Sequence, residues 1–226
     1  GVISRILKLF INRPLIYTFH GIHLECHNWS YRLAYIIYEY LLGWVDSKKI
    51  LVSQSENNYA EKSKIFLGND SLIINNGVRN MPIKNYFEED FDNKSFLASN
   101  KTNVISVCRF VQQKNIYEII KIAIELPNIN FYIIGDGPLW HQLKNFIDIK
   151  ILKNVILLGS KRNVFRYLYE ADIYLSTSLY EGLPLSILEA MSIGLPIVAS
   201  NVAGNCDTII HGESGFYYDL SDIYKA

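Results

Sequence analysis

The stretch Leu179–Ser200, LYEGLPLSILEAMSIGLPIVAS, decides the fold class. It contains a Gly-Leu-Pro turn, a helix-like run over 185–192, a second Gly-Leu-Pro turn and a short apolar strand over 197–199. Another continuous apolar run, 173–176, comes just before it. Apolar strands separated by single helices are typical of a parallel sheet that helices cover on both faces. The stretch therefore predicts an α/β fold built on a parallel sheet.

The same alternation of strand and helix extends upstream through most of the chain. A polar segment, 80–102, which is acidic in its middle, interrupts it and is predicted to be a linker. We expect two Rossmann-like domains, 1–79 and 103–226, with ligands at the carboxyl ends of their strands. The predicted strands are 15–23, 49–54, 71–75, 104–109, 130–134, 155–158, 173–176, 197–199 and 215–218, and the predicted helices are 29–45, 57–67, 116–126, 139–147, 164–170 and 185–192.

The composition excludes several classes of protein. The 226 residues are 50% hydrophobic and carry 22 basic and 22 acidic side chains, so a general polyanion-binding surface, and hence nucleic-acid binding, is not expected. No run of 18 apolar residues predicts a spanning helix. Three widely spaced cysteines fit a reducing, cytoplasmic setting.

Residues 1–50 hold six basic and three acidic side chains, a local excess of positive charge. Such an excess, beside the apolar residues of VISRILKLFINR, is compatible with peripheral contact to an anionic membrane. A solvated face, with the apolar side chains packed against the sheet, explains the pattern equally well. Peripheral location on the inner face of the cell membrane is therefore one of two expectations for this segment.

Two cations follow the strand 104–109 in the sequence CRFVQQKN. Arg109 ends the predicted strand and Lys114 lies five residues on, across the loop to the next helix. Two fixed cations at the carboxyl edge of a sheet suit a diphosphate. The alternative is an exposed loop with two solvated side chains.

Glycines follow the next two strands. In IIGDGPLW, Gly135 and Gly137 allow the backbone of the loop, which includes Asp136, to approach a ligand closely. Trp140 occupies the position where a dinucleotide fingerprint requires its third glycine, which disfavours a nicotinamide-dependent oxidoreductase. Ser160, after the following strand, can border a nucleotide base. For this loop and for the glycine loop before it, a tight turn without a ligand is the simpler explanation.

Two glutamates, Glu181 and Glu189, flank a predicted anion site within Leu179–Ser200. Pro184 suits a first helical turn, and the free N–H groups of a helix that starts near 183–185 attract a phosphate. A phosphate with a carboxylate on either side describes a sugar nucleotide, because carboxylates accept hydrogen bonds from paired hydroxyls. Alternatively, Glu181 caps the helix and Glu189 is an ordinary helix residue, although its apolar neighbours favour burial and a partner.

Taken together, four segments resemble the GT-B glycosyltransferases, and specifically the large retaining family four, in its bacterial exopolysaccharide and capsule branch. They are Arg109-x4-Lys114, GDGP at 135–138, Glu181-GLPLSIL-Glu189 and GNCDTIIHGESGF at 204–216. The upstream YTFHGIH at 17–23 is similar to the amino-terminal domain of the family. The resemblance implies two Rossmann-like domains, the first incomplete at its start and the second lacking its last helices.

The resemblance also implies residue roles. Arg109 and Lys114 would neutralise the donor diphosphate, with the backbone of Gly182, Leu183 and Pro184 nearby. Glu189 would hold the ribose hydroxyls and Glu181 the hydroxyls of the donor sugar. Four other residues of the second domain would border the nucleotide, namely Gly135, Asp136, Gly137 and Ser160.

His20, in the first domain, would face the reacting sugar. A zinc site from His20, His23, Cys26 and His27 is not expected, because their spacing is not a usual ligand set. The expected reaction is metal-independent transfer of a sugar from a UDP- or GDP-sugar to a glycan or polyprenyl-linked acceptor, in the cytoplasm. The alternatives are a non-catalytic remnant that binds nucleotide and a sugar-nucleotide epimerase of the same architecture.

Overall fold

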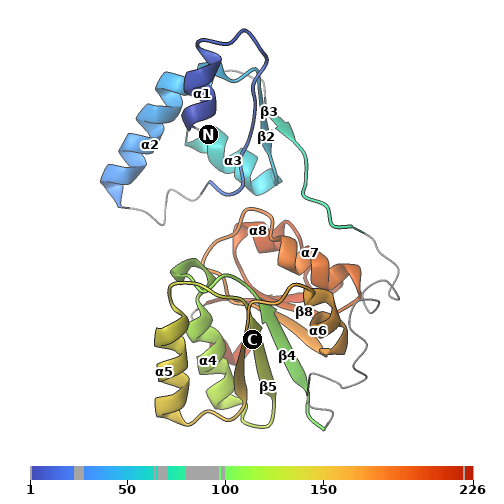
Figure 1. Ribbon diagram of the computed structural model, residues 1–226. Helices are drawn as coiled ribbons and strands as arrows, with labels where there is room; N and C mark the ends of the chain where they lie inside the picture. The colour runs from blue at the N-terminus through green and yellow to red at the C-terminus, as the bar shows by residue number, and fades with distance from the viewer. Residues whose placement is uncertain are drawn as a thin grey trace. The chain divides into compact units, whose positions relative to one another are not determined.

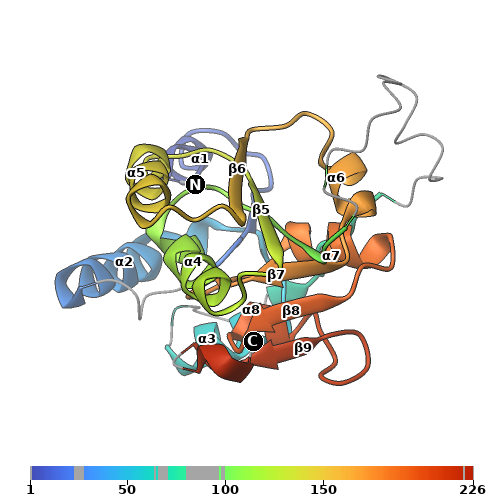
Figure 2. The ribbon, with the colours of Figure 1, turned by 90° about the horizontal axis from the view of Figure 1, so that it is seen from below.

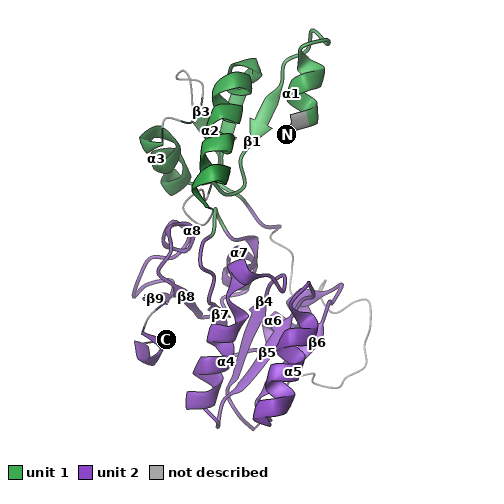
Figure 3. Cartoon of the chain, turned by 90° about the vertical axis from the view of Figure 1, so that its left-hand side faces the viewer, with its two compact units in different colours: residues 1–76, 181–183 green, residues 77–180, 184–226 purple. Residues whose placement is uncertain are grey.

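The computed structural model describes residues 2–22, 28–63, 65, 71–79, 97, 100–220 and 222–225. The chain forms two compact units, coloured separately in Figure 3: unit 1 comprises Gly1–Asn76 with Glu181–Leu183, and unit 2 comprises Gly77–Tyr180 with Pro184–Ala226. Most of the predicted linker, 80–102, lies outside the described residues.

Unit 2 is built on a six-stranded parallel sheet. Its strands are β4 (Asn103–Val107), β5 (Asn130–Ile134), β6 (Val155–Gly159), β7 (Ile173–Ser176), β8 (Ile197–Ser200) and β9 (Phe216–Tyr218). Their order across the sheet is β6-β5-β4-β7-β8-β9. The chain therefore builds outward from β4 to one edge, returns to the middle, and builds outward to the other edge, which is the doubly wound arrangement.

Helices cover both faces of this sheet, as Figures 1 and 2 show. On one face lie α4 (Ile116–Glu125) and α5 (Trp140–Lys150), and on the other lie α6 (Val164–Glu170) and α7 (Leu185–Ser192). A short helix, α8 (Ala203–Cys206), follows β8. Right-handed crossovers through these helices are what parallel strands require.

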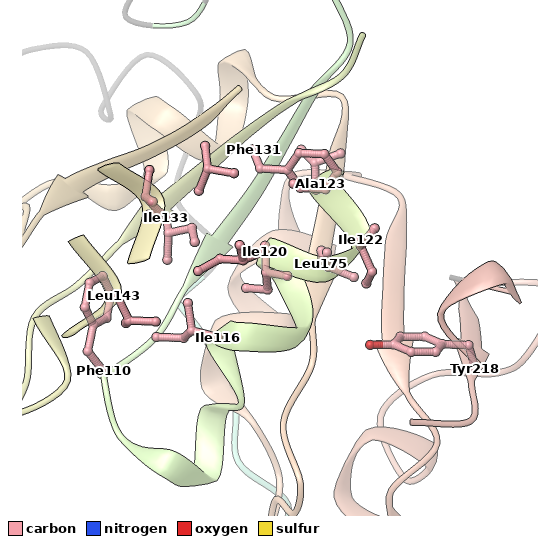
Figure 4. Packing of buried hydrophobic residues seen from close by; sticks show 14 residues of the cluster. Phe110, Ile116, Ile120, Ile122, Ala123, Phe131, Ile133, Leu143, Leu175 and Tyr218 are labelled. Carbon is pink, nitrogen blue, oxygen red and sulfur yellow. The ribbon is translucent and has the colours of Figure 1, made fainter. Parts of the chain in front are cut away.

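The strands of unit 2 divide their side chains between two buried clusters. Along β5, Phe131 and Ile133 enter one cluster, while Tyr132 and Ile134 enter the other. Figure 4 shows the first cluster, in which residues of α4 and α5 pack on the sheet; they include Ile116, Ile120, Ile122 and Leu143. A strand buried on both faces needs apolar side chains on both, which explains the run FYII in β5 and the mostly apolar VISV in β4. The buried hydroxyl of Ser106 in β4 donates a hydrogen bond to the Leu175 carbonyl.

Unit 1 contains a smaller parallel sheet of three described strands in the order β1-β2-β3, namely β1 (Ile16–Thr18), β2 (Lys48–Leu51) and β3 (Ser71–Ile73). Its helices are α1 (Val2–Lys8), α2 (Trp29–Leu42) and α3 (Gln54–Lys62), with a 3-10 turn at Gly43–Val45 after α2. Phe19, Ile22, Leu51, Ala60 and Ile65 form its buried core. None of the described helices combines the length and apolarity that crossing a bilayer requires.

The structure corrects several predicted boundaries. The helix predicted over 57–67 begins earlier, at Gln54, because the Ser53 hydroxyl caps it by accepting a hydrogen bond from the Glu56 backbone N–H. The strand predicted over 15–23 is confined to Ile16–Thr18. The α8 helix was not predicted, since four residues are too few to establish a helical period.

Candidate functional site

The centre of the six-stranded sheet is where the direction of winding reverses. There β4 and β7 are neighbours, although two strands separate them in sequence, with Val104 opposite Ile173 and Ile105 opposite Tyr174. The loops that leave their carboxyl ends turn to opposite faces of the sheet, because α4 and α7 lie on opposite faces (Figure 2). Open α/β sheets bind ligands in the crevice between such loops.

Hydrogen bonds join these two loops directly. The Leu179 N–H donates to the Gln113 carbonyl at 2.8 Å, and the Gln113 side-chain amide donates to the Tyr180 carbonyl at 2.9 Å. The hydroxyl of Thr177, which is 2% exposed, donates to the Lys114 carbonyl at 2.9 Å. The loop that carries Arg109 and Lys114 is therefore fixed to the loop that leads into α7.

A small polar hollow lies between the two loops. It is lined by Lys114 together with hydroxyl side chains from β4, β7, the loop after β7 and α7, which are Ser106, Ser176, Thr177, Ser178 and Ser186. The hollow thus combines a cation, several hydroxyl groups and the beginning of a helix, the three kinds of group that bind phosphate. Arg109, on the same loop, is exposed.

The α7 helix begins at Leu185, with Pro184 at the N-cap position. Pro184 has extended backbone angles and makes no side-chain hydrogen bond to the first turn. The predicted helix start near 183–185 is confirmed, with the refinement that Pro184 precedes the first turn. Without a capping side chain, the N–H groups of the first turn remain suited to an anion.

Glu189 lies one turn inside α7, where it is half-buried. Burial raises the pKa of its carboxyl group. Within the described residues, no hydrogen bond or ion pair is recorded for its carboxylate oxygens. A half-buried carboxylate without a hydrogen-bonding partner among the described residues is suited to accept hydrogen bonds from a ligand.

Glu181 is 7% exposed and, with Gly182 and Leu183, belongs to unit 1 by its contacts, whereas Pro184 and Glu189 belong to unit 2. The structure therefore does not bring the two glutamates into one unit. Their joint action on a ligand stays a prediction.

The two glycines of the GDGP loop face the loop that carries Arg109. Gly135 and Gly137 have φ values of +142° and +156°, and a Cβ atom on them would lie 1.8 Å from the Cys108 carbonyl oxygen and 2.6 Å from that of Phe110, respectively. The Phe110 N–H donates to the Asp136 carbonyl at 2.8 Å, which binds the loops together. These glycines therefore fix the position of Arg109 through backbone contact, in addition to any approach to a nucleotide.

In the sequence, Trp140 is only a departure from the dinucleotide fingerprint. In the structure it packs against Phe110, which follows Arg109 in the loop after β4. Its ring stacks on Phe110, with centroids 5.4 Å apart and planes at 15°. The indole also approaches Gly159, the last residue of β6, and exposed Ser160 follows it. The sequence could have indicated this packing, because an aromatic residue closely follows the glycine loop.

Sequence reasoning also missed Gln113 and Thr177, whose side chains join the two loops. Each stands within three residues of a predicted strand end or cation, but nothing in the sequence shows that their partners are backbone carbonyls of a loop over 60 residues away. Asp136, in turn, is exposed and accepts a hydrogen bond from the adjacent Gly137 N–H at 2.7 Å. Its side chain therefore shapes the turn.

His20, in unit 1, is exposed and comes just after β1, at the carboxyl end of that strand. The other residues weighed for a zinc site, His23, Cys26 and His27, lie outside the described residues. Among the residues that are described, no group of three or more His, Cys, Asp or Glu side chains is placed to hold a metal ion.

Comparison with known proteins places this geometry in a family. The family model described as glycosyl transferases group 1 matches residues 87–224. The chain is 31% identical, over 99% of its length and 61% of the relative, to UDP-Gal:alpha-D-GlcNAc-diphosphoundecaprenol alpha-1,3-galactosyltransferase of Escherichia coli. It is 24% identical to the capsular polysaccharide biosynthesis glycosyltransferase CapM of Staphylococcus aureus, over 100% of its own length and 62% of that protein.

Solved structures agree on the fold. HepE of Anabaena in complex with UDP-glucose matches 99% of this chain and 65% of its own, with a TM-score of 0.82 and 21% identity. A sucrose-phosphate synthase from Thermosynechococcus elongatus matches with a TM-score of 0.81 and 19% identity. The chain spans about three-fifths of the curated relatives named above. The predicted GT-B class of α/β fold is confirmed, and the chain belongs to the family of group 1 glycosyl transferases.

Proposed function

We propose that the protein transfers a sugar from a nucleotide sugar to a glycan or polyprenyl-linked acceptor, with retention of anomeric configuration, in the synthesis of a bacterial surface polysaccharide. One observation carries the proposal: the loops after β4 and β7 are hydrogen-bonded together at the point where the winding reverses, with two cations on one loop and the start of α7 after the other. Membership of the group 1 family supports the type of reaction.

A UDP-sugar is the donor that we favour over a GDP-sugar. The name of the Escherichia coli relative specifies UDP-Gal as its donor, and HepE was solved in complex with UDP-glucose. The same relative acts on a diphosphoundecaprenol-linked acceptor, and CapM is a capsular polysaccharide enzyme by name. These names support a lipid-linked acceptor. With such an acceptor, we propose that the protein works in the cytoplasm, at the inner face of the cell membrane.

Arg109 and Lys114 are proposed to stabilise the diphosphate as the bond to the sugar breaks. Negative charge grows on the leaving phosphate oxygen in the transition state, and preorganised cations lower the free energy of that state. The first turn of α7 adds the positive end of a helix dipole. These groups supply the charge that a divalent metal would otherwise provide, so we propose a metal-independent reaction.

The remaining roles concern the rest of the donor. Glu189 is proposed to accept hydrogen bonds from the ribose hydroxyls, which would compensate the burial that raises the pKa of its carboxyl group. Glu181, with the backbone of Gly182 and Leu183, is proposed to hold the sugar hydroxyls. Gly135, Asp136, Gly137 and Ser160 are proposed to border the nucleotide, and His20 to act at the reacting sugar.

Thermal unfolding with UDP, GDP, ADP and NAD tests the donor site. A ligand at about 100 times its dissociation constant adds about 2.7 kcal/mol of stability. For a chain of this size we expect UDP to raise the Tm by roughly 5–10 °C, and Glu189→Ala to remove most of the shift. A shift with NAD alone, or none with any nucleotide, would contradict the proposal.

The stereochemistry needs a separate measurement. With a UDP-sugar and a polyprenyl diphosphate-linked sugar, proton NMR of the product should show the anomeric configuration of the donor. The inverted anomer would overturn the proposed retention and leave the donor site standing.

A further inference from the structure

Glu56, in the first turn of α3, is a buried carboxylate to which the proposed function assigns no role; it is 3% exposed. With Ser53 at the N-cap, its position matches a capping box, in which the glutamate side chain returns to the N–H of the capping residue. The structure shows a different arrangement. Glu56 Oε2 accepts from the Val52 N–H at 3.2 Å, and Oε1 accepts from the Ile22 N–H at 3.0 Å. The carboxylate therefore ties α3 to a loop 34 residues earlier in the chain.

The loop that Glu56 holds is the turn that carries His20. Phe19, just before this turn, is 4% exposed, and its N–H donates to a carbonyl of β2 at 2.9 Å. Ile22, just after it, is also 4% exposed and belongs to the core of unit 1. Between them, Gly21 has a φ of +123°, which favours glycine, and His20 is exposed. The position of the imidazole therefore depends on how the two ends of the turn are fixed.

The surroundings of Glu56 act on its charge in two directions. Loss of solvent raises the pKa of its carboxyl group. Hydrogen bonds from three backbone N–H groups, those of Val52, Ile22 and Gly21, act in the opposite direction, and so does the electrostatic attraction to His20. A glutamine would avoid the burial of a charge, but its amide has one oxygen instead of two to accept from these N–H groups. The carboxylate is therefore matched to the turn that it holds.

Gly182, which belongs to unit 1 by its contacts, lies against the same carboxylate. A Cβ atom on Gly182 would be 3.0 Å from Glu56 Oε1 and 3.1 Å from the Gly21 nitrogen. The backbone that follows Glu181 therefore comes close to the turn of His20 at the point that Glu56 holds. Both segments are proposed to act on the donor sugar, so Glu56 adjoins two parts of one candidate site.

We propose that Glu56 is a positioning residue for His20. Its carboxylate fixes the turn after β1, so that the imidazole is held in one orientation toward the donor sugar. The inference rests on the proposed function, in which His20 acts at the reacting sugar. Glu56 is buried and acts through His20, without touching the sugar. Displacing a catalytic group by about 1 Å can lower the rate by about 100-fold, so loss of this hold should be visible in the kinetics.

A purely structural role for Glu56 predicts a different result. In that case the carboxylate only satisfies buried N–H groups, and its loss should loosen unit 1 as a whole, as the loss of a helix cap does. Ser53→Ala provides the matched control. It removes the hydroxyl that caps α3 by accepting from the Glu56 N–H at 3.2 Å, and it leaves the carboxylate in place.

Amide hydrogen exchange, followed by NMR on the whole chain, measures how firmly the turn is held. In Glu56→Ala, the amides of Gly21 and Ile22 should exchange at least about tenfold faster than in the unchanged chain, and the ring resonances of His20 should shift. Glu56→Gln keeps one neutral acceptor, serves if Glu56→Ala does not fold, and should exchange at an intermediate rate. In Ser53→Ala, these amides and the His20 ring should behave as in the unchanged chain.

Transfer kinetics connect the turn to the reaction. With a UDP-sugar and a polyprenyl diphosphate-linked sugar, Glu56→Ala should lower kcat by roughly 10–100-fold. The KM for the donor should change little, because the substitution leaves the loops of unit 2 unchanged. Since Glu56 acts through His20, adding Glu56→Ala to His20→Ala should cause no further loss. Ser53→Ala should keep its kcat at temperatures below its Tm.

Unchanged exchange at Gly21 and Ile22 in both Glu56 variants, or an equal loss of protection in Ser53→Ala, would overturn the proposal. So would kcat losses in His20→Ala and Glu56→Ala that multiply in the double variant. The effect of UDP on the Tm tests the donor site separately. If the unchanged chain binds UDP without transferring a sugar, the proposed function fails, and the exchange rates with the His20 resonances still decide whether Glu56 holds the turn.

Discussion

The two units of the molecule satisfy their buried polar groups in different ways. In unit 2, the loops after β4 and β7 are joined by hydrogen bonds to backbone carbonyls, donated by the Leu179 N–H and by the side chains of Gln113 and Thr177. Close approach by glycines fixes the loop of Arg109. In unit 1, a single buried guanidinium holds two carboxylates and ties α1 to α2. The first arrangement depends on backbone geometry and the second on charge balance, so the two units should respond differently to substitution.

The largest effect is expected from breaking the charge balance in unit 1. Arg5→Met leaves Glu39 and Asp46 buried without a cation, and removing one partner of a buried ion pair typically lowers the free energy of unfolding by about 3–5 kcal/mol. Chemical denaturation followed by circular dichroism measures the loss. Stabilisation of unit 2 by UDP should persist, because no residue of its loops is changed.

The matched control removes the charges together. Arg5→Met/Glu39→Leu/Asp46→Leu replaces the whole triad with apolar side chains and should recover most of the lost stability. If the triple variant is no more stable than Arg5→Met, the charge-balance explanation is wrong.

The next effect tests the backbone contact in unit 2. Gly135→Ala forces a Cβ toward the Cys108 carbonyl, so the loop of Arg109 must move, at a cost of about 2–4 kcal/mol in folding free energy. Gly194→Ala is the control, because its φ of +78° is also unfavourable for alanine but nothing lies within 4 Å of the new Cβ. Thermal unfolding should separate the two, and similar Tm values would mean that backbone strain, not the contact, determines the effect.

The joined loops offer a smaller and more local test. Thr177→Val removes the donor that the Lys114 and Asn115 carbonyls share and should lower stability by about 1–2 kcal/mol, with weaker UDP binding. Thr208→Val also removes a bond from a hydroxyl to a carbonyl, that of Gly204, but leaves the two loops untouched. Calorimetric titration with UDP should find weaker binding in Thr177→Val alone.

The smallest effect concerns pH. Because burial raises the pKa of the Glu189 carboxyl group, its ionised form destabilises the folded state, and this penalty appears as the pH rises through the raised pKa. Glu189→Gln should therefore be more stable than the unchanged chain at pH 7 and lose that advantage at pH values below the ordinary pKa of glutamate. Tm values across this range check the sign, and an advantage that does not depend on pH would contradict it.

The sheet of unit 2 was largely predictable from sequence because its strands are buried on both faces. Runs such as NFYII have no polar interruption, and the predicted strand 130–134 coincides with β5. Helix ends were harder, as at Gln54, where the signal was present in Ser53 and Glu56 but the apolar period alone was followed.

The sequence indicated the charged residues of the candidate site, but not the residues whose hydrogen bonds hold its loops in place. Arg109 and Lys114 stand out as cations after an apolar strand. Gln113 and Thr177 have no distinguishing pattern, because their partners are carbonyls brought close by the sheet order. Arg5 was expected at a surface, and its burial depends on Glu39 and Asp46, which are more than 30 residues away in sequence.

The central claim is that the joined loops after β4 and β7 bind a nucleoside diphosphate. Calorimetric titration of UDP and uridine into the unchanged chain, Arg109→Ala and the control Arg162→Ala, another exposed arginine of unit 2, tests it most directly. Hydrogen bonds to charged groups contribute about 1.5–3 kcal/mol, so Arg109→Ala should weaken UDP binding by roughly 10–100-fold and leave uridine and the control unaffected. Equal UDP binding by Arg109→Ala and the unchanged chain would contradict the account.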